Sequence, residues 1–134
     1  MRSVMVVEDD EIFRDAAVEV LTAAGYRVRV AHDGADAFAV LARGPLPDAI
    51  LLDLGMPHMS GWQFRELQKR HGALRHIPVV VMTGGDPLGV EAAAILQKPF
   101  EMAALAEAFE RVLGREPAGA RRAEPVWTPL PRLP

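Results

Sequence analysis

The sequence predicts an α/β fold in which a parallel five-stranded sheet lies between two layers of helices. Short apolar runs of strand length alternate with segments of helical periodicity from residue 4 to residue 113. Several of these runs are apolar throughout, as strands are when both faces of a parallel sheet are covered. With 134 residues, half of them hydrophobic, the chain can bury the core of one such domain.

Five segments carry the strand signal. The predicted strands are Val4–Val7, Tyr26–Ala31, Ala49–Leu52, Val79–Met82 and Ala94–Gln97. The second alternates apolar and charged residues, which is typical of an edge strand with one exposed face. The third and fourth are continuously apolar, which indicates strands that are buried on both faces.

Four segments carry the helical signal. The predicted helices are residues 11–21, 35–42, 62–70 and 101–113. In the first, Asp10 is the expected N-cap and Gly25 the expected residue after the C-cap. Its apolar face is predicted to comprise Ile12, Ala16, Val20 and Leu21, with Phe13 and Ala17 beside them. The second helix is predicted to carry Ala37, Phe38 and Leu41 inward. Phe64, Leu67 and Gln68 are spaced along the third, and the fourth has Leu105, Ala108, Phe109, Val112 and Leu113 on one face.

Composition excludes several classes of protein. The net charge is −3, and no basic run exceeds two arginines, which argues against a nucleic-acid surface. The absence of cysteine excludes disulfides and thiolate metal sites. No apolar run approaches the roughly 20 residues that span a bilayer, and the first residues do not resemble a signal peptide. We therefore expect a cytoplasmic protein that starts naturally at Met1 and has no membrane contact.

Polar residues follow the apolar strands where each strand ends. Glu8, Asp9 and Asp10 follow the first strand, and Asp53, Thr83 and Lys98 follow the third, fourth and fifth. In a parallel sheet these ends meet at one edge. Clustered carboxylates repel one another unless a cation lies among them, and oxygen ligands suit Mg²⁺. A carboxylate nucleophile, Mg²⁺, a lysine and a hydroxyl together make a site for phosphoryl transfer.

At these motifs the chain resembles the receiver domain of two-component response regulators. The resemblance covers about Ser3 to Leu113. It rests on residues 6–10, on 51–57 with Ser60-Gly61, on 81–83 and on Lys98-Pro99-Phe100, in the order and spacing of the family. It implies the doubly wound, flavodoxin-like sheet with strand order 2-1-3-4-5. The predicted domain is residues 1–114, followed by a proline-rich, extended or polyproline-like tail, residues 115–134.

The resemblance also implies roles for individual residues. Asp53 would be the phosphoacceptor, and Thr83 and Lys98 would hold the phosphoryl oxygens. The Lys98-Pro99 peptide bond would be cis. The implied Mg²⁺ ligands are Asp9, Asp53 and the Gly55 carbonyl directly, and Glu8 through water. Such a domain is a phosphoacceptor rather than an enzyme, and it promotes its own Mg²⁺-dependent phosphorylation and dephosphorylation.

Three departures from the family pattern concern the path of the signal and the lifetime of the phosphoryl group. The position three before the lysine, usually aromatic, is Ile95. Thr83 and Lys98 are about two helical turns closer than usual, so the fourth helix is expected to be short or missing, with at most one turn over Leu88–Ala92. The positions two after the aspartate and two after the threonine, which tune hydrolysis of the phosphoryl group, are Gly55 and Gly85.

The main hypothesis is a stand-alone receiver that takes a phosphoryl group from a histidine kinase or phosphotransfer protein and signals to a downstream protein. The alternative is an adaptor that has the fold but signals without phosphorylation. A phosphatase is disfavoured because the position two after the nucleophile is Gly55, where an acid/base aspartate is expected.

Other polar and aromatic residues are not assigned to the chemistry. The four histidines (His32, His58, His71 and His76) show no metal-ligand spacing and are expected at the surface. Trp62 is interpreted as a packing or partner contact. Trp127, in the tail, is equally consistent with docking on the domain and with binding a partner.

Overall fold

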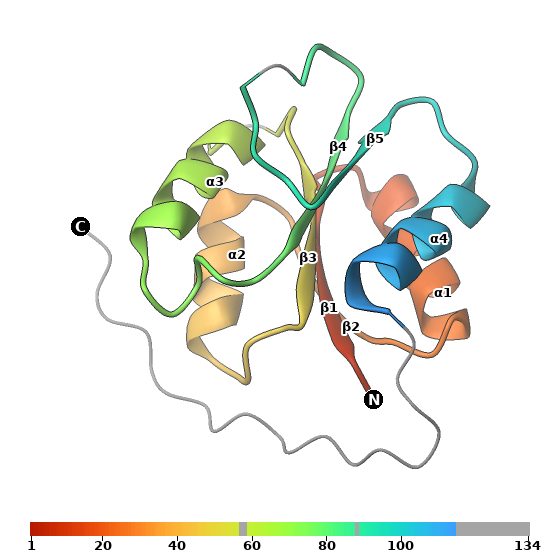
Figure 1. Cartoon of the computed structure of the whole chain (residues 1–134), viewed down its shortest axis with the longest axis horizontal. Coiled ribbons are helices and arrows are strands. Elements are labelled where there is room, and N and C mark those ends of the chain that lie inside the picture. The colour runs from red at the N-terminus through yellow and green to blue at the C-terminus, as the bar shows by residue number, and fades with distance from the viewer. Residues whose placement is uncertain (57–58, 88, 115–134) are drawn as a thin grey trace.

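The computed structural model describes residues 1–56, 59–87 and 89–114, and these form a three-layer α/β domain (Figure 1). The strands are β1 (Ser3–Val7), β2 (Arg27–Ala31), β3 (Ala49–Asp53), β4 (Val79–Thr83) and β5 (Ala94–Gln97). The helices are α1 (Glu11–Ala23), α2 (Gly34–Ala42), α3 (Gly61–Arg70) and α4 (Met102–Leu113). The predicted elements are all present, with ends that differ by one or two residues. The predicted tail, residues 115–134, lies outside the described residues, as do Pro57 and His58.

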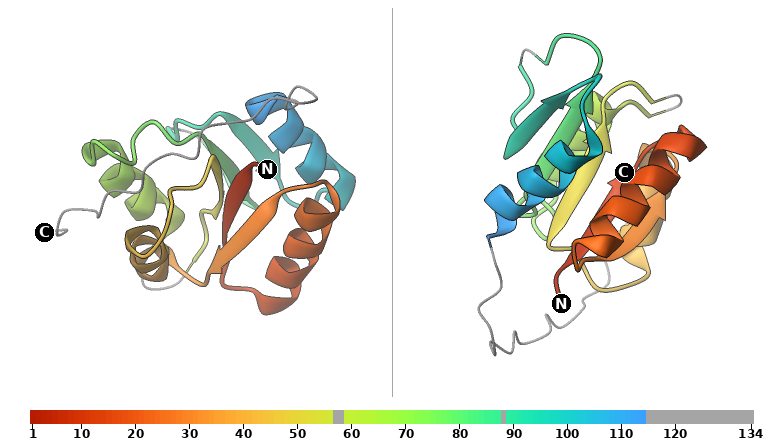
Figure 2. Two further views of the ribbon diagram at one scale, coloured as in Figure 1. Left: turned by 90° about the horizontal axis from the view of Figure 1, so that it is seen from below. Right: turned by 90° about the vertical axis from the view of Figure 1, so that its right-hand side faces the viewer.

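The strands form one parallel sheet in the order β2-β1-β3-β4-β5, as predicted. β2 lies at one edge, where its alternating pattern had placed it, and β5 lies at the other. Every strand therefore points its carboxyl end to the same side of the sheet, which is the arrangement that gathers the predicted site residues. In the left view of Figure 2 the strands lie between α2 and α3 on one side and α1 and α4 on the other.

Each face of the sheet is covered by two helices. α2 and α3 cover one face, where Phe38 and Phe64 lie with ring centroids 4.7 Å apart. α1 and α4 cover the other face, where Leu21 and Phe109 are fully buried. Successive residues of β1 and β3 enter opposite clusters because side chains alternate along a strand. The central strands are thereby fixed from both sides.

The buried face of α1 differs from the prediction at Ile12. This side chain is 84% exposed, whereas Ala17 and Leu21 are buried and Phe13 is partly buried. Phe13, Ala17 and Leu21 are spaced four apart and form the row that packs on the sheet, and the predicted Ala16 and Val20 beside them are partly buried. Helical periodicity had grouped the apolar residues correctly but had not determined which row contacts the core.

The ends of α1 agree with the prediction. The Asp10 side chain accepts hydrogen bonds from the backbone N–H groups of Ile12 and Phe13, at 3.0 and 3.2 Å. At the other end the chain passes through Ala24 to Gly25, which has a φ of +99°. That left-handed conformation favours glycine, so Gly25 ends the helix and turns the chain toward β2.

The connection between β4 and β5 contains no helix in its described residues, 84–87 and 89–93. The short or missing fourth helix is thus confirmed, and the helix labelled α4 is the one after β5. The helical turn allowed for over Leu88–Ala92 is not formed in residues 89–92. A single turn closes instead, in which the Val90 N–H donates to the Pro87 carbonyl at 3.1 Å. Val90 and Ala92 pack against the core beneath α3.

Two polar side chains are buried in and after α3. Gln68 is fully buried, and its amide donates to the carbonyls of Leu74 and Ile77 at 3.0 and 3.1 Å. His71 is only 8% exposed, so the prediction that it lies at the surface is wrong, whereas His32 and His76 are exposed. The burial of His71 follows from the turn that Gln68 holds closed, which folds the α3–β4 connection back on the core. Among the described helices, none is long and apolar enough to cross a membrane.

Candidate functional site

The carboxyl ends of four strands deliver the predicted side chains to one edge of the sheet. Asp53 and Thr83 are the last residues of β3 and β4, and each is 6% exposed. Glu8 and Asp9 follow β1 directly, and Lys98 follows β5. Asp53, Thr83 and Lys98 line one cleft. The rule that parallel strand ends converge had predicted this grouping from sequence.

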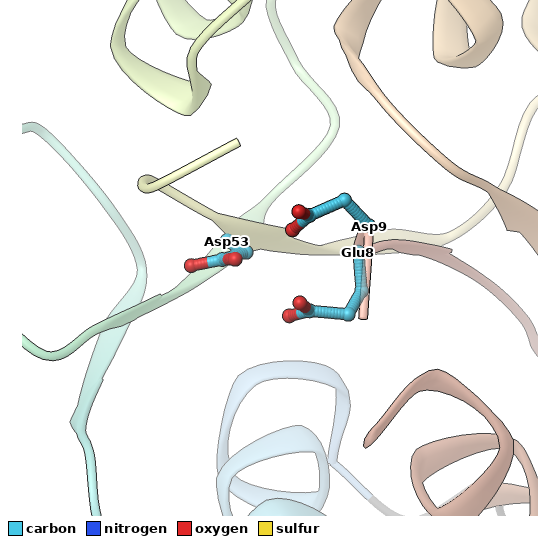
Figure 3. Close-up of side chains that lie close together, drawn as sticks. All are labelled: Glu8, Asp9 and Asp53. Atoms are coloured by element: carbon cyan, nitrogen blue, oxygen red, sulfur yellow. The ribbon is translucent and has the colours of Figure 1, made fainter. Parts of the chain in front are cut away.

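Three carboxylates form a cluster at this edge. One oxygen from each of Glu8, Asp9 and Asp53 lies within 4.8 Å of the others. Figure 3 shows Glu8 and Asp9, at the end of β1, with their carboxylates directed toward Asp53 at the end of β3. Glu8 is buried, and Asp9 is exposed. The cluster therefore has a dry side and a side that is open to solvent.

Lys98 lies between the two buried carboxylates. Its Nζ is 3.5 Å from Glu8 Oε2 and 3.6 Å from Asp53 Oδ1. The ammonium also lies 4.8 Å from the centroid of the Phe13 ring, which packs edge-on against Phe100 at 5.8 Å. These contacts hold one positive charge against two negative ones. The Lys98-Pro99 peptide bond is cis, as the resemblance implied.

The environment of Glu8 favours a cation or a proton beside it. Burial, and next the negative charge of Asp53, raise the pKa of Glu8 to about 7, although the Asp10 N–H and Lys98 oppose the shift. Glu8 Oε1 accepts from the Asp10 N–H at 3.1 Å, whereas Oε2 is buried without a hydrogen-bond partner. The charged group beside Oε2 is the Lys98 ammonium at 3.5 Å, and an all-oxygen donor set of this kind suits Mg²⁺ and its coordinated waters.

The backbone after Asp53 is shaped by two glycines. The Gly55 N–H donates to Asp53 Oδ1 at 3.2 Å. Gly61, the first residue of α3, donates to the Leu54 carbonyl at 3.2 Å. A β-carbon at Gly61 would collide with the Asp53 carbonyl oxygen and lie 2.7 Å from Leu54 Cα. α3 can begin this close to the end of β3 only because residue 61 has no side chain.

The remaining walls of the cleft come from α3 and from the β4–β5 connection. Thr83 Oγ1 accepts from the Gly85 N–H at 3.0 Å, and a hydroxyl in that position can still donate its own proton. Trp62 and Asp86 also line the cleft, and sequence reasoning assigned neither of them to the site. For Asp86 the available signal was its place in the loop that leaves Thr83. For Trp62 it was the position after Gly61, at the start of a helix beside the acceptor strand.

Ile95 does not line the cleft. It is 43% exposed, and it pairs in register with Val81, which packs in the core on the α2–α3 side. Paired residues of neighbouring strands point to the same face. Ile95 thus lies on the face that a helix between β4 and β5 would cover.

Comparison with known proteins agrees with this geometry. The family model of the response regulator receiver domain matches residues 4–110. The chain is 35% identical over 130 residues to the response regulator MprA of Mycobacterium tuberculosis, covering 91% of this chain and 52% of MprA. The chain thus spans about half the length of that relative. It is 32% identical over 120 residues to the polar-differentiation response regulator DivK of Brucella anthropi, covering 84% of this chain and 97% of DivK.

Solved structures show the same fold. The chemotaxis protein CheY4 of Vibrio cholerae superposes with a TM-score of 0.76 at 28% identity, covering 84% of this chain and 98% of CheY4. The receiver domain of the sensor histidine kinase PA1611 of Pseudomonas aeruginosa gives a TM-score of 0.74 at 27% identity, covering 85% and 98%. That structure is described with a magnesium ion coordinated in its active-site cleft.

Proposed function

The chain belongs to the response regulator receiver domain family, and on that premise we propose that Asp53 accepts a phosphoryl group from a histidine kinase or a phosphotransfer protein. The observation that carries the proposal is the position of the Lys98 ammonium, 3.6 Å from Asp53 Oδ1 and 3.5 Å from Glu8 Oε2. Phosphoryl oxygens carry negative charge in the transition state of transfer. A positive charge held at the acceptor carboxylate stabilises that charge.

The chemistry follows from the residues around Asp53. An Asp53 oxygen attacks phosphorus, a P–O bond forms, and the P–N bond to the donor imidazole breaks with its electron pair leaving on nitrogen. Lys98 and the Thr83 hydroxyl then hold two phosphoryl oxygens. Bound Mg²⁺ would neutralise a further share of the charge. Asp9, Asp53 and the Gly55 carbonyl are the proposed direct ligands, with Glu8 acting through water.

We propose further that the protein is a single-domain regulator of the cytoplasm that acts on a downstream protein rather than on nucleic acid. The near-complete coverage of DivK supports this, as does the net charge of −3. In that role the protein is a phosphoacceptor that promotes its own Mg²⁺-dependent phosphorylation and dephosphorylation.

A second candidate is an adaptor with a receiver fold that signals without phosphorylation. The exposed Ile95 and the absence of a helix from the described residues of the β4–β5 connection favour it, because both lie where a phosphorylation signal would leave the domain. The adaptor needs neither Mg²⁺ nor Asp53, so the same experiment tests both candidates.

The test is phosphorylation of the full chain with a small acyl phosphate and millimolar Mg²⁺, followed by intact mass spectrometry. We expect one phosphoryl group per chain, none in Asp53→Asn, and unchanged labelling in the control Asp15→Asn on the exposed side of α1. Equal labelling of Asp53→Asn would overturn the site. Absence of both labelling and Mg²⁺ binding in the wild type would favour the adaptor.

A further inference from the structure

An apolar groove runs along the exposed side of α3. It is lined by Met59, Trp62, Gln63, Glu66 and Leu67. In α3, Trp62 is four residues before Glu66, and Gln63 is four residues before Leu67. The four side chains therefore share one side of the helix. Trp62 is 37% exposed and, with Met59 and Leu67, it makes the apolar part of this lining. Glu66 supplies an exposed carboxylate at the rim, with Lys69 Nζ 4.0 Å from its Oε1.

The walls of the groove are held in place by the core. Met59 packs so closely on Gly34 of α2 that a β-carbon there would lie 2.7 Å from Met59 Cγ. Met59 and Leu67 both pack against the cluster beneath α2 and α3. Trp62 lines this groove and also the cleft that holds Asp53. The groove and the acceptor cleft therefore share one wall.

The chain carries a segment whose chemistry matches this groove. Residues 125–133 combine the apolar side chains Val126, Trp127, Leu130 and Leu133 with three prolines. Proline-rich segments bind aromatic-lined grooves at low entropic cost because they are already extended. Residues 115–134 contain four arginines and two acidic residues, a net charge of +2. With a total of −3, residues 1–114 carry −5, so the two parts attract each other.

The length of the chain allows the contact. Trp127 follows Gly114, the residue after α4, by thirteen positions. An extended chain of that length spans about 40 Å at about 3.1 Å per residue. A domain of this size has a radius of gyration of roughly 13 Å, so its width is on the order of 35 Å. Residue 127 can thus reach α3 from α4, although the two helices cover opposite faces of the sheet.

We propose that residues 125–133 bind in the groove on α3, with Trp127 and Leu130 against Trp62 and Leu67 and with arginine beside Glu66. Tethering gives the segment an effective concentration of the order of millimolar, so even a weak contact is populated.

The test uses paramagnetic relaxation in the full chain. The protein has no cysteine, so Ala123→Cys carries a single nitroxide just outside the segment. Without donor or Mg²⁺, we expect selective broadening of the amide signals of Trp62, Gln63 and Glu66, at least threefold stronger than in β2. When Trp127→Ala and Leu130→Ala are introduced into the nitroxide-labelled protein, the α3 signals should be broadened no more than those of β2. Glu66→Gln weakens it, and the matched Glu19→Gln on α1 does not.

Two results would overturn the proposal. One is broadening that is uniform over the domain. The other comes from mixing isotope-labelled protein that has no nitroxide with unlabelled protein that carries it. Broadening of the α3 signals in this mixture would show that the segment of a second copy of the chain occupies the groove. Because this measurement involves no phosphoryl group, its failure is distinct from failure of Asp53 to be phosphorylated.

Discussion

The acceptor edge of the sheet and the connection between β4 and β5 meet at Thr83, and they are built in different ways. At the edge, Glu8, Asp53 and Thr83 are buried where the parallel strands end, and Lys98 bridges two of the carboxylates. In the connection, the described residues contain no helix, and Ile95 beyond them is 43% exposed. The edge follows the family pattern, and the connection departs from it.

The difference has a physical cause. The positions of the edge residues are set by the register of the strands. Helices on both faces of the sheet hold these strands in place. The connection is held instead by side chains of α3. Arg65 Nε donates to the Glu91 carbonyl at 2.8 Å, and Lys69 Nζ lies 3.3 Å from the Glu91 carboxylate. We infer that the chemistry at Asp53 depends on the sheet. The β4–β5 connection, along which the signal leaves, can therefore change while that chemistry stays the same. Four predictions test this separation.

The largest effect is expected from Lys98→Met. The substitution keeps an unbranched apolar stem but removes the charged Nζ, which lies 3.6 Å from Asp53 Oδ1. The rate of labelling by a small acyl phosphate should fall about 100-fold or more, as when one preorganised charge is removed from a transfer site. Ile95→Ala, three residues away, should label within about twofold of wild type. A wild-type rate in Lys98→Met would mean that the edge does not carry the chemistry.

Gly61→Ala should be the most destabilising small substitution at the edge. Its β-carbon would meet the backbone of Asp53 and Leu54, which can move only by shifting β3 or α3. We expect a loss of about 2–3 kcal/mol in the free energy of unfolding. The control is Gly72→Ala, where no atom lies within 4 Å and an alanine should change stability by less than about 0.5 kcal/mol. Urea titration measures the free energy of unfolding of both variants. Equal values for Gly61→Ala and Gly72→Ala would contradict the close approach of α3 to β3.

The third prediction concerns pH. Burial raises the pKa of Glu8 to about 7 from an ordinary 4.5, so the folded protein binds this proton more tightly than the unfolded chain does. Its contribution to stability is complete below pH 4.5 and is lost as the pH rises through 7. In Mg²⁺-free buffer, Glu8→Gln should therefore become more stable than wild type by on the order of 2 kcal/mol at pH 7.

The control for this experiment is Glu107→Gln, an exposed carboxylate on α4. Its unfolding free energy should follow that of the wild type at every pH. If Glu8→Gln also follows the wild type from pH 4.5 to 7, Glu8 is not desolvated as the structure indicates.

The same division separates what the sequence could and could not predict. Uninterrupted apolar runs identified the central strands, and the convergence of parallel strand ends then grouped Asp53, Thr83 and Lys98. Those inferences need only local pattern and topology. The exposure of Ile12 was missed because periodicity fixes the rows of a helix and not the row that meets the sheet. The burial of His71 was missed because it depends on the path of a turn held by Gln68.

The additional walls of the cleft were missed for a related reason. Trp62 and Asp86 reach the site through the start of α3 and the start of the β4–β5 connection. The direction of Trp62 depends on how closely α3 approaches β3, which is set by packing at Gly61, and that of Asp86 depends on the path of the connection after Thr83. The raised pKa of Glu8 likewise depends on burial beside a second carboxylate, which sequence spacing alone does not give.

The smallest effect is expected from Arg65→Met, which acts on the connection and leaves the edge intact. Methionine keeps the apolar stem of Arg65 but loses its bonds to the Glu91 carbonyl, at 2.8 Å, and to Gln68 Oε1, at 3.1 Å. The free energy of unfolding should fall by about 1 kcal/mol. Hydrogen exchange of the Val90 amide should accelerate, while phosphoryl uptake stays at the wild-type rate. The control Glu91→Gln keeps the backbone carbonyl and removes only the exposed charge that faces Lys69 and Arg65, so it should cost less than about 0.5 kcal/mol. If Arg65→Met instead lowered the rate of phosphoryl uptake as well as accelerating hydrogen exchange of the Val90 amide, the connection would be coupled to the acceptor edge. The separation of the two regions would then be wrong.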